Sequence, residues 1–179
     1  MTDNVSRKPL LLLAWLTATA CSIHVFESLI MRLLPLPFIR IGLSNVIVMY
    51  LILEKKPGEA LIVNVAKSVV GGVVTFTLLT PSTLLSLGGG FAAILAMWIA
   101  CQARLGFSPF GVSVCGAVAH NLAQLALIKL FVLPAADVFV LTPILLLLGL
   151  LSGILTAWIF LLVRAKFAQL EMKKDELER

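Results

Sequence analysis

Long apolar runs separated by short polar or proline-containing segments dominate the chain. A helix needs about 20 mainly apolar residues to cross a bilayer. Six runs approach that length, at about residues 10–31, 39–53, 59–79, 88–105, 112–133 and 138–163. The second is short for a complete span, so we expect it to be tilted or partly re-entrant. The pattern predicts an all-α polytopic membrane protein with six transmembrane helices.

Composition supports this class. The chain has 179 residues, of which 60% are hydrophobic and 13% charged, whereas a soluble domain is about 45–50% apolar and about 25% charged. We expect one domain with three regions: a cytoplasmic N-terminus (1–9), a six-helix transmembrane domain (10–163) and a charged, helical cytoplasmic tail (164–179). The mean hydropathy is +1.08.

The basic residues predict an orientation rather than a nucleic-acid partner. The formal net charge is +5, but the basic residues lie at segment ends and form no single patch. Most belong to the N-terminus, the second and fourth loops and the tail, whereas the opposite loops carry only Arg32 and Arg40. Because cytoplasmic loops are enriched in Lys and Arg, we expect both termini to be cytoplasmic, in a bacterial inner membrane.

The fifth run carries polar side chains where lipid is expected. At 3.6 residues per turn, Asn121 lies about 100° away from a single stripe of residues. The stripe contains Ser113, Gly116, Ala117, His120 and Gln124. Asn121 therefore either widens the stripe or faces a second neighbour. Such groups are costly in hydrocarbon unless they face a protein interior or a water-filled cavity. Together they favour a polar binding site over a single satisfied core histidine.

Other runs supply partners for this stripe. Glu27 could pair with Arg40, either as a structural clamp on the intervening proline turn or with Arg40 facing a ligand anion, which guanidinium binds in bidentate fashion. Asn45 lies about one helical turn after Arg40 in the second apolar run. Lys67 lies about 12 Å from the inner end of its helix by helix rise, too deep to reach the surface easily. Structural and functional roles for Lys67 are equally open.

Several kinds of site are disfavoured. His24 is the second of two histidines, and neither has a carboxylate at metal-ligand spacing. Glu27 is the carboxylate that falls inside a span, which disfavours a catalytic triad. Gly88-Gly89-Gly90 lacks the Lys-Ser/Thr of a phosphate loop, so we expect a tight turn with close helix approach before the fourth helix. We expect no metal, no cofactor and no catalytic residue.

These motifs resemble a known family. Its pattern is carried by Glu27-Ser-Leu-Ile, Pro35-x-Pro37, Arg40-Ile-Gly-Leu-x-Asn45, Ser86-Leu-Gly-Gly and Gly111-Val-Ser-x-x-Gly-Ala-x-x-His120-Asn121-x-x-Gln124. They are similar to the Gx transporter family, also labelled heptaprenyl diphosphate synthase component I, which resembles the substrate-binding S components of energy-coupling factor (ECF) transporters.

The resemblance implies a six-helix S-component-like bundle with an outward-facing pocket. It also implies that a first-helix face bearing Ala14 and Ala18, a small-xxx-small pair, docks on a membrane coupling subunit driven by ATPases. The synthase label conflicts with the chain's chemistry, because prenyl elongation needs clustered aspartates to hold magnesium and diphosphate. Here Asp3, Asp137 and Asp175 are scattered.

The sequence thus favours a substrate-binding subunit of a small-molecule uptake transporter, with an anionic or phosphorylated ligand. The expected site residues are Glu27, Arg40, Asn45, Lys67, His120, Asn121 and Gln124. The alternative is a non-catalytic membrane subunit associated with heptaprenyl diphosphate synthase in isoprenoid-quinone biosynthesis.

Overall fold

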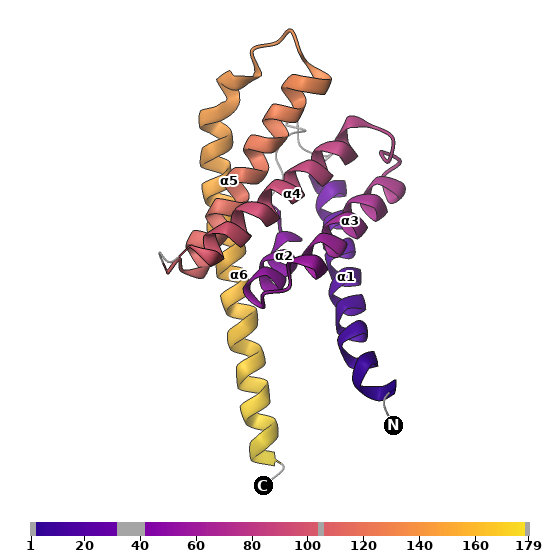
Figure 1. Cartoon of the computed structure of the whole chain (residues 1–179), viewed down its shortest axis with the longest axis vertical. Helices are drawn as coiled ribbons and strands as arrows, with labels where there is room; N and C mark the ends of the chain where they lie inside the picture. Colours follow the sequence, from indigo (N-terminus) through magenta and orange to yellow (C-terminus); the bar gives the residue numbers. More distant parts are fainter. Residues whose placement is uncertain (1–2, 32–41, 104–105, 178–179) are drawn as a thin grey trace.

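Every regular element in the described part of the chain is helical. The computed structural model describes residues 3–31, 42–103 and 106–177 (Figure 1). Its elements are α1 (Asp3–Met31), α2 (Asn45–Leu53), α3 (Pro57–Val74), α4 (Pro81–Gln102), α5 (Pro109–Leu127), a π-helical turn η1 (Ile128–Val132), a 3₁₀ turn η2 (Val138–Leu141) and α6 (Thr142–Leu177). The predicted all-α class is confirmed.

Three helices begin at prolines. Pro57, Pro81 and Pro109 are the first residues of α3, α4 and α5. Proline suits this position because its fixed φ is already helical and its missing N–H has no partner in the first turn of a helix. The same residues that interrupt the apolar runs in the sequence therefore start the helices in the structure.

The helices form a bundle with α2 at its centre. The chain passes up through α1 and down through α2, then alternates through α3, α4, α5 and α6, so that both ends of the chain lie at the same end of the molecule (Figure 1). α1 packs on α3, α4 packs on α3 and α5, and α6 packs on α5. α2 contacts α3, α4 and α6. Its buried residues belong to the main hydrophobic core: Ile47, Val48, Met49, Leu51 and Ile52.

Within the residues that the structure describes, five helical segments are long and apolar enough to cross a membrane. They are Pro9–Ile30, Pro57–Val74, Pro81–Gln102, Pro109–Val132 and Val138–Lys166. α2 has nine residues, which is about 14 Å at 1.5 Å per residue and roughly half of a hydrocarbon core of about 30 Å. The predicted second helix, about 39–53, begins in residues that lie outside the described ones. In the described part α2 is a short, buried helix.

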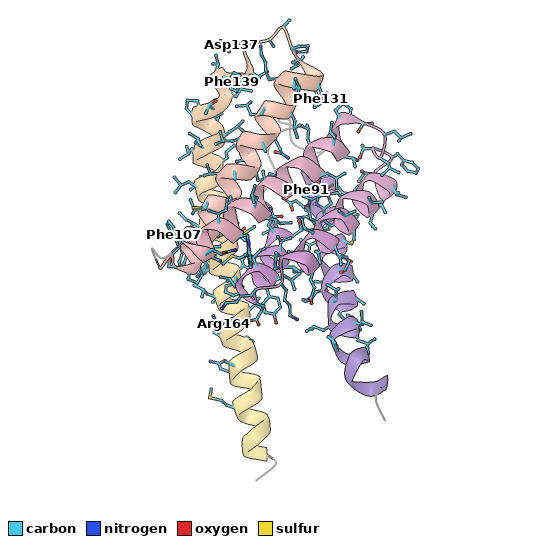
Figure 2. The ribbon with its side chains drawn as sticks, viewed as in Figure 1. Phe91, Phe107, Phe131, Asp137, Phe139 and Arg164 are labelled. Carbon is cyan, nitrogen blue, oxygen red and sulfur yellow. The ribbon has the colours of Figure 1, made fainter. Side chains whose placement is uncertain are left out.

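The outer surface of the bundle is apolar. Leu95, Leu147 and Trp158, on α4 and α6, are each more than half exposed. Two charged residues mark the limits of this surface, with Asp137 near one end and Arg164 where α6 leaves the bundle (Figure 2). An apolar outer surface and several apolar helices are the features of a multi-pass membrane protein.

The start of the fourth helix differs from the sequence prediction. The sequence predicted a fourth helix at about 88–105 that begins with a tight turn at Gly88–Gly90, but α4 runs unbroken from Pro81 to Gln102. The turn prediction was wrong because these glycines leave room for side chains of neighbouring helices. The expected close approach of helices is confirmed. The third helix also ends earlier than predicted, at Val74.

Candidate binding cavity

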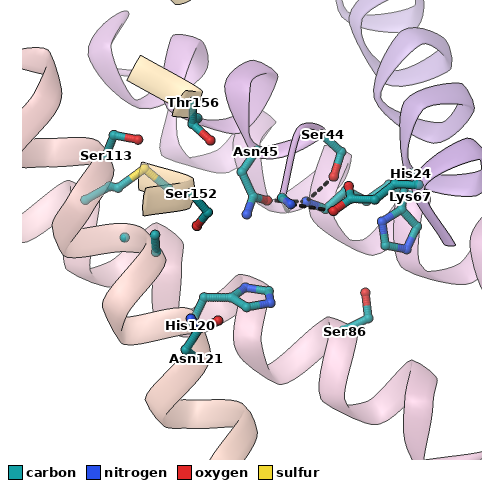
Figure 3. A pocket seen from close by; sticks show the side chains of 15 residues that line it. His24, Ser44, Asn45, Lys67, Ser86, Ser113, His120, Asn121, Ser152 and Thr156 are labelled. Atoms are coloured by element: carbon teal, nitrogen blue, oxygen red, sulfur yellow. Dashed lines mark hydrogen bonds between the residues drawn. The ribbon is translucent and has the colours of Figure 1, made fainter. Parts of the chain in front are cut away.

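A polar cavity lies inside the bundle (Figure 3). Its empty space is about 570 Å³, a figure that includes the part open to the outside. All six α-helices and the segment before α2 contribute to its wall. The lining residues are His24, Glu27, Gly42, Ser44, Asn45, Lys67, Ser86, Met97, Ser113, Gly116, Ala117, His120, Asn121, Ser152 and Thr156.

Lys67 lies on the cavity wall and is only 3% exposed. Its ammonium group donates hydrogen bonds to Asn45 Oδ1 at 2.5 Å and Ser44 Oγ at 3.3 Å (Figure 3). A buried ammonium group needs such partners, because it has lost the hydration that stabilises it in water. The contacts join the middle of α3 to the start of α2. The structure thus brings together two predicted site residues, Lys67 and Asn45.

Glu27 holds the chain segment that enters α2. Its carboxylate, buried on α1, accepts a hydrogen bond from the backbone N–H of Gly42. Gly42 has a φ of +76°, in the left-handed region that favours glycine. The predicted partner Arg40 lies outside the described residues, as does the Glu27–Arg40 pair. Among described lining residues, Lys67 and Glu27 bring opposite charges, so their formal sum is zero when both histidines are neutral.

The fifth helix contributes the largest share of the wall. Ser113, Gly116, Ala117, His120 and Asn121 all line the cavity, as the helical stripe predicted for most of them. Gln124 does not line it. Its side chain is buried against α4, where Nε2 is 3.5 Å from the carbonyl oxygen of Leu85. Gln124 therefore supports the packing of α5 on α4, one turn after His120 along α5.

Asn121 fits both alternatives that the sequence left open. Its Nδ2 donates a 2.8 Å hydrogen bond to the carbonyl oxygen of Leu145 on α6. The side chain also borders the cavity. Asn121 thus faces a second neighbour, and it fastens α5 to α6 at the cavity wall.

This contact yields a stability prediction. Replacing Asn121 with Ala removes the hydrogen bond to Leu145, and bonds of this kind between transmembrane helices contribute about 0.6 kcal/mol on average. We expect the free energy of unfolding in mixed micelles to fall by about that amount. Leu122→Ala, which trims an exposed side chain on the same helix, is the control for a general loss of side-chain surface. A loss of several kcal/mol in Asn121→Ala would contradict the expected modest bond.

Several cavity residues were not assigned to the site from the sequence. His24 on α1 and Ser152 and Thr156 on α6 all line it. A signal was present for α6, because Ser152 and Thr156 are four residues apart in an otherwise Leu-rich helix and so share one face. His24 precedes Glu27 by one turn. An isolated Ser or Thr in an apolar helix commonly bonds its own backbone, so this signal is weak without the structure.

The predicted partner face lies away from the cavity. Ala14 and Ala18 are exposed on α1, next to Trp15, which is 74% exposed.

Within the described residues, no group of three or more His, Cys, Asp and Glu side chains could hold a metal ion.

A family model matches most of the chain. The model described as heptaprenyl diphosphate synthase component I matches residues 16–162, which include every described cavity residue. This confirms the family indicated by the sequence motifs. Searches of curated proteins and of solved structures found no significant match.

Proposed function

Since this chain belongs to the heptaprenyl diphosphate synthase component I family and its helices surround a partly open cavity with charged and polar side chains in its wall, we propose that it is the substrate-binding subunit of a membrane uptake system for a small molecule. The cavity is the observation that carries the proposal. Burying Lys67, Glu27 and two histidines inside an apolar bundle is costly. Binding a polar ligand is a function that would explain why these residues are buried there. The subunit would resemble the S components of ECF transporters.

The proposed ligand is anionic or phosphorylated. Lys67 supplies a cation on the cavity wall, and the negative charge of Glu27 is engaged by the Gly42 N–H. Either histidine would add a positive charge on protonation. Arg40, two residues before Gly42 in the sequence, is the further cation that we assign to this ligand.

The family description supports a second candidate, a non-catalytic membrane subunit of a heptaprenyl diphosphate synthase. Three scattered aspartates leave the catalytic step to another protein. A hydrocarbon prenyl chain would also offer no hydrogen-bond partner to the charged and imidazole groups that line the cavity. Reconstitution with a prenyl synthase separates the two: a change in rate or product length would favour this second candidate.

The first test is native mass spectrometry of the protein purified gently from its host's membranes. We expect a stoichiometric small-molecule adduct that is lost in His120→Ala, which removes an imidazole from the cavity wall. Leu122→Ala on the same helix should keep the adduct, because Leu122 is exposed on the outside. An adduct that survives His120→Ala unchanged would contradict the site. An empty cavity with a tightly bound protein partner would favour the second candidate.

We further propose that α1 docks on a membrane coupling subunit driven by ATPases, and that both termini are cytoplasmic in a bacterial inner membrane. The exposed Ala14/Ala18 face would let another helix approach closely. Ala18→Leu should reduce co-purification of such a subunit without loss of the small-molecule adduct. Leu10→Ile, at an exposed apolar position of the same helix, is the control. Equal recovery of the partner with both variants would contradict this face.

A further inference from the structure

Both histidines of the cavity lie against glycines of a neighbouring helix. His24 on α1 faces Gly71 on α3, and His120 on α5 faces Gly89 on α4. The two imidazoles line the same cavity but come from different helices, as the labelled side chains in Figure 3 show. Each imidazole therefore occupies space that a larger residue on the facing helix would fill.

The available space is small in both places. A Cβ atom at position 71 would lie 2.5 Å from His24 Cδ2 and 3.0 Å from its Nε2. A Cβ atom at position 89 would lie 2.9 Å from both Cε1 and Nε2 of His120. These separations are shorter than the ~3.5–4.0 Å at which nonbonded carbon atoms attract. Even alanine would make each ring move.

The rings would move more easily than the helices. A side-chain rotation changes one or two torsions, whereas separating two packed helices loses many contacts at once. An imidazole turned away from its glycine changes the direction in which its nitrogens present donors and acceptors to the cavity. Glycine at these two positions thus leaves the space in which the imidazoles lie.

We infer that Gly71 and Gly89 are positioning residues that set the orientation of His24 and His120 towards the bound molecule. This inference rests on the proposed function for its consequence in binding. The glycines themselves do not appear in the cavity wall, so their effect is exerted through the imidazoles. The spaces beside Gly71 and Gly89 thus place two histidines at the site, so that the molecule is held by imidazoles from α1 and α5.

The chain suits a direct test because it contains only two histidines. Protein labelled with ¹⁵N-histidine and purified with a histidine-free affinity tag gives imidazole signals from His24 and His120 alone. We expect Gly89→Ala to shift the His120 signals and leave those of His24, and Gly71→Ala to do the reverse. Gly58→Ala is the matched control, because a Cβ atom there meets nothing within 4 Å.

Three outcomes would overturn the inference. Each alanine could leave the facing imidazole's signals in place, or Gly58→Ala could shift them as strongly. The third concerns folding: if Gly71→Ala does not fold, His24→Ala in the same chain should restore folding by vacating the space, and failure to do so contradicts the contact. All three of the atoms nearest to a Cβ at position 71 belong to His24, whereas one of those at position 89 belongs to Gln124. The rescue experiment is therefore easier to interpret for Gly71 and His24.

The binding consequence is measured separately. The probe is the co-purifying mass adduct, and we expect its occupancy ratio to fall about tenfold in Gly89→Ala, equivalent to about 1.4 kcal/mol. The same substitution in a His120→Ala background should cause no further loss. If the imidazole signals shift as expected while His120→Ala keeps the adduct, the positioning role stands and the proposed function fails. If His120→Ala loses the adduct but Gly89→Ala leaves both signals and adduct unchanged, the inference fails alone.

Discussion

Replacing Gly153 with Ala is expected to lower the free energy of unfolding by about 1–3 kcal/mol, the usual cost of overpacking a well-packed interior. A Cβ atom there would lie 2.7 Å from Val114 Cα and 3.1 Å from Val114 N. These are backbone atoms of α5, so no rotamer change can relieve the clash. α6 would have to move away from α5, a helix with which it packs extensively.

Thermal unfolding followed by circular dichroism in micelles measures this effect. Gly58→Ala is the control for helix propensity, which by itself favours Ala over Gly by about 1 kcal/mol. It should be neutral or stabilising, because position 58 is open. If Gly153→Ala is also stabilising, the close approach of α5 and α6 is contradicted. Since Ser152 and Thr156 line the cavity from the same part of α6, destabilisation should be accompanied by weaker adduct retention.

The second large effect is expected from Lys67→Met, which keeps most of the side-chain length but removes the charge. Loss of one buried, hydrogen-bonded charge at a binding site costs about 2–5 kcal/mol. We therefore expect at least ~30-fold lower retention of an anionic adduct. The change also removes the contacts of Lys67 with Asn45 and Ser44, so the start of α2 loses its link to α3.

A matched lysine separates these effects from a general loss of charge. Lys129 donates a 2.9 Å hydrogen bond to the carbonyl oxygen of Ala136, where the loop follows η1, and it does not line the cavity. Lys129→Met should retain the adduct. Lys67→Arg tests charge against shape, because the wider guanidinium keeps the cation but not its geometry. Full retention in Lys67→Met would contradict an anionic ligand held by this residue.

Local patterns were sufficient to predict that the chain is helical and roughly where its helices lie, because helix formation depends on neighbours in the sequence. Apolar runs of spanning length predicted the all-α class, and the proline breaks mark the starts of α3, α4 and α5. The 3.6-residue period placed Ser113, Gly116, Ala117 and His120 on one face of α5. The motifs also predicted the family that the matching model confirms.

Which polar groups meet depends on helix packing and was not available from periodicity. The sequence placed Gln124 on the stripe of His120, but α4 covers it and its amide lies near Leu85. In the sequence, Ser152 and Thr156 are ordinary residues of an apolar helix. The packing of α6 on α5 places them at the cavity. The glycines at 88–90 suggested a turn, because glycine favours both turns and close helix contacts. Only their neighbours in space distinguish the two.

Hydrophobic period, charge distribution and proline positions thus specify a helical membrane protein with polar groups in its first, second, third and fifth apolar runs. They do so because backbone hydrogen bonds within lipid leave few structures except helices. The enclosure of those groups in one cavity, the pairing of Lys67 with Asn45, and the seating of each histidine on a glycine follow from contacts between distant residues. Those contacts depend on side-chain shape across helix interfaces, which a one-dimensional pattern does not encode.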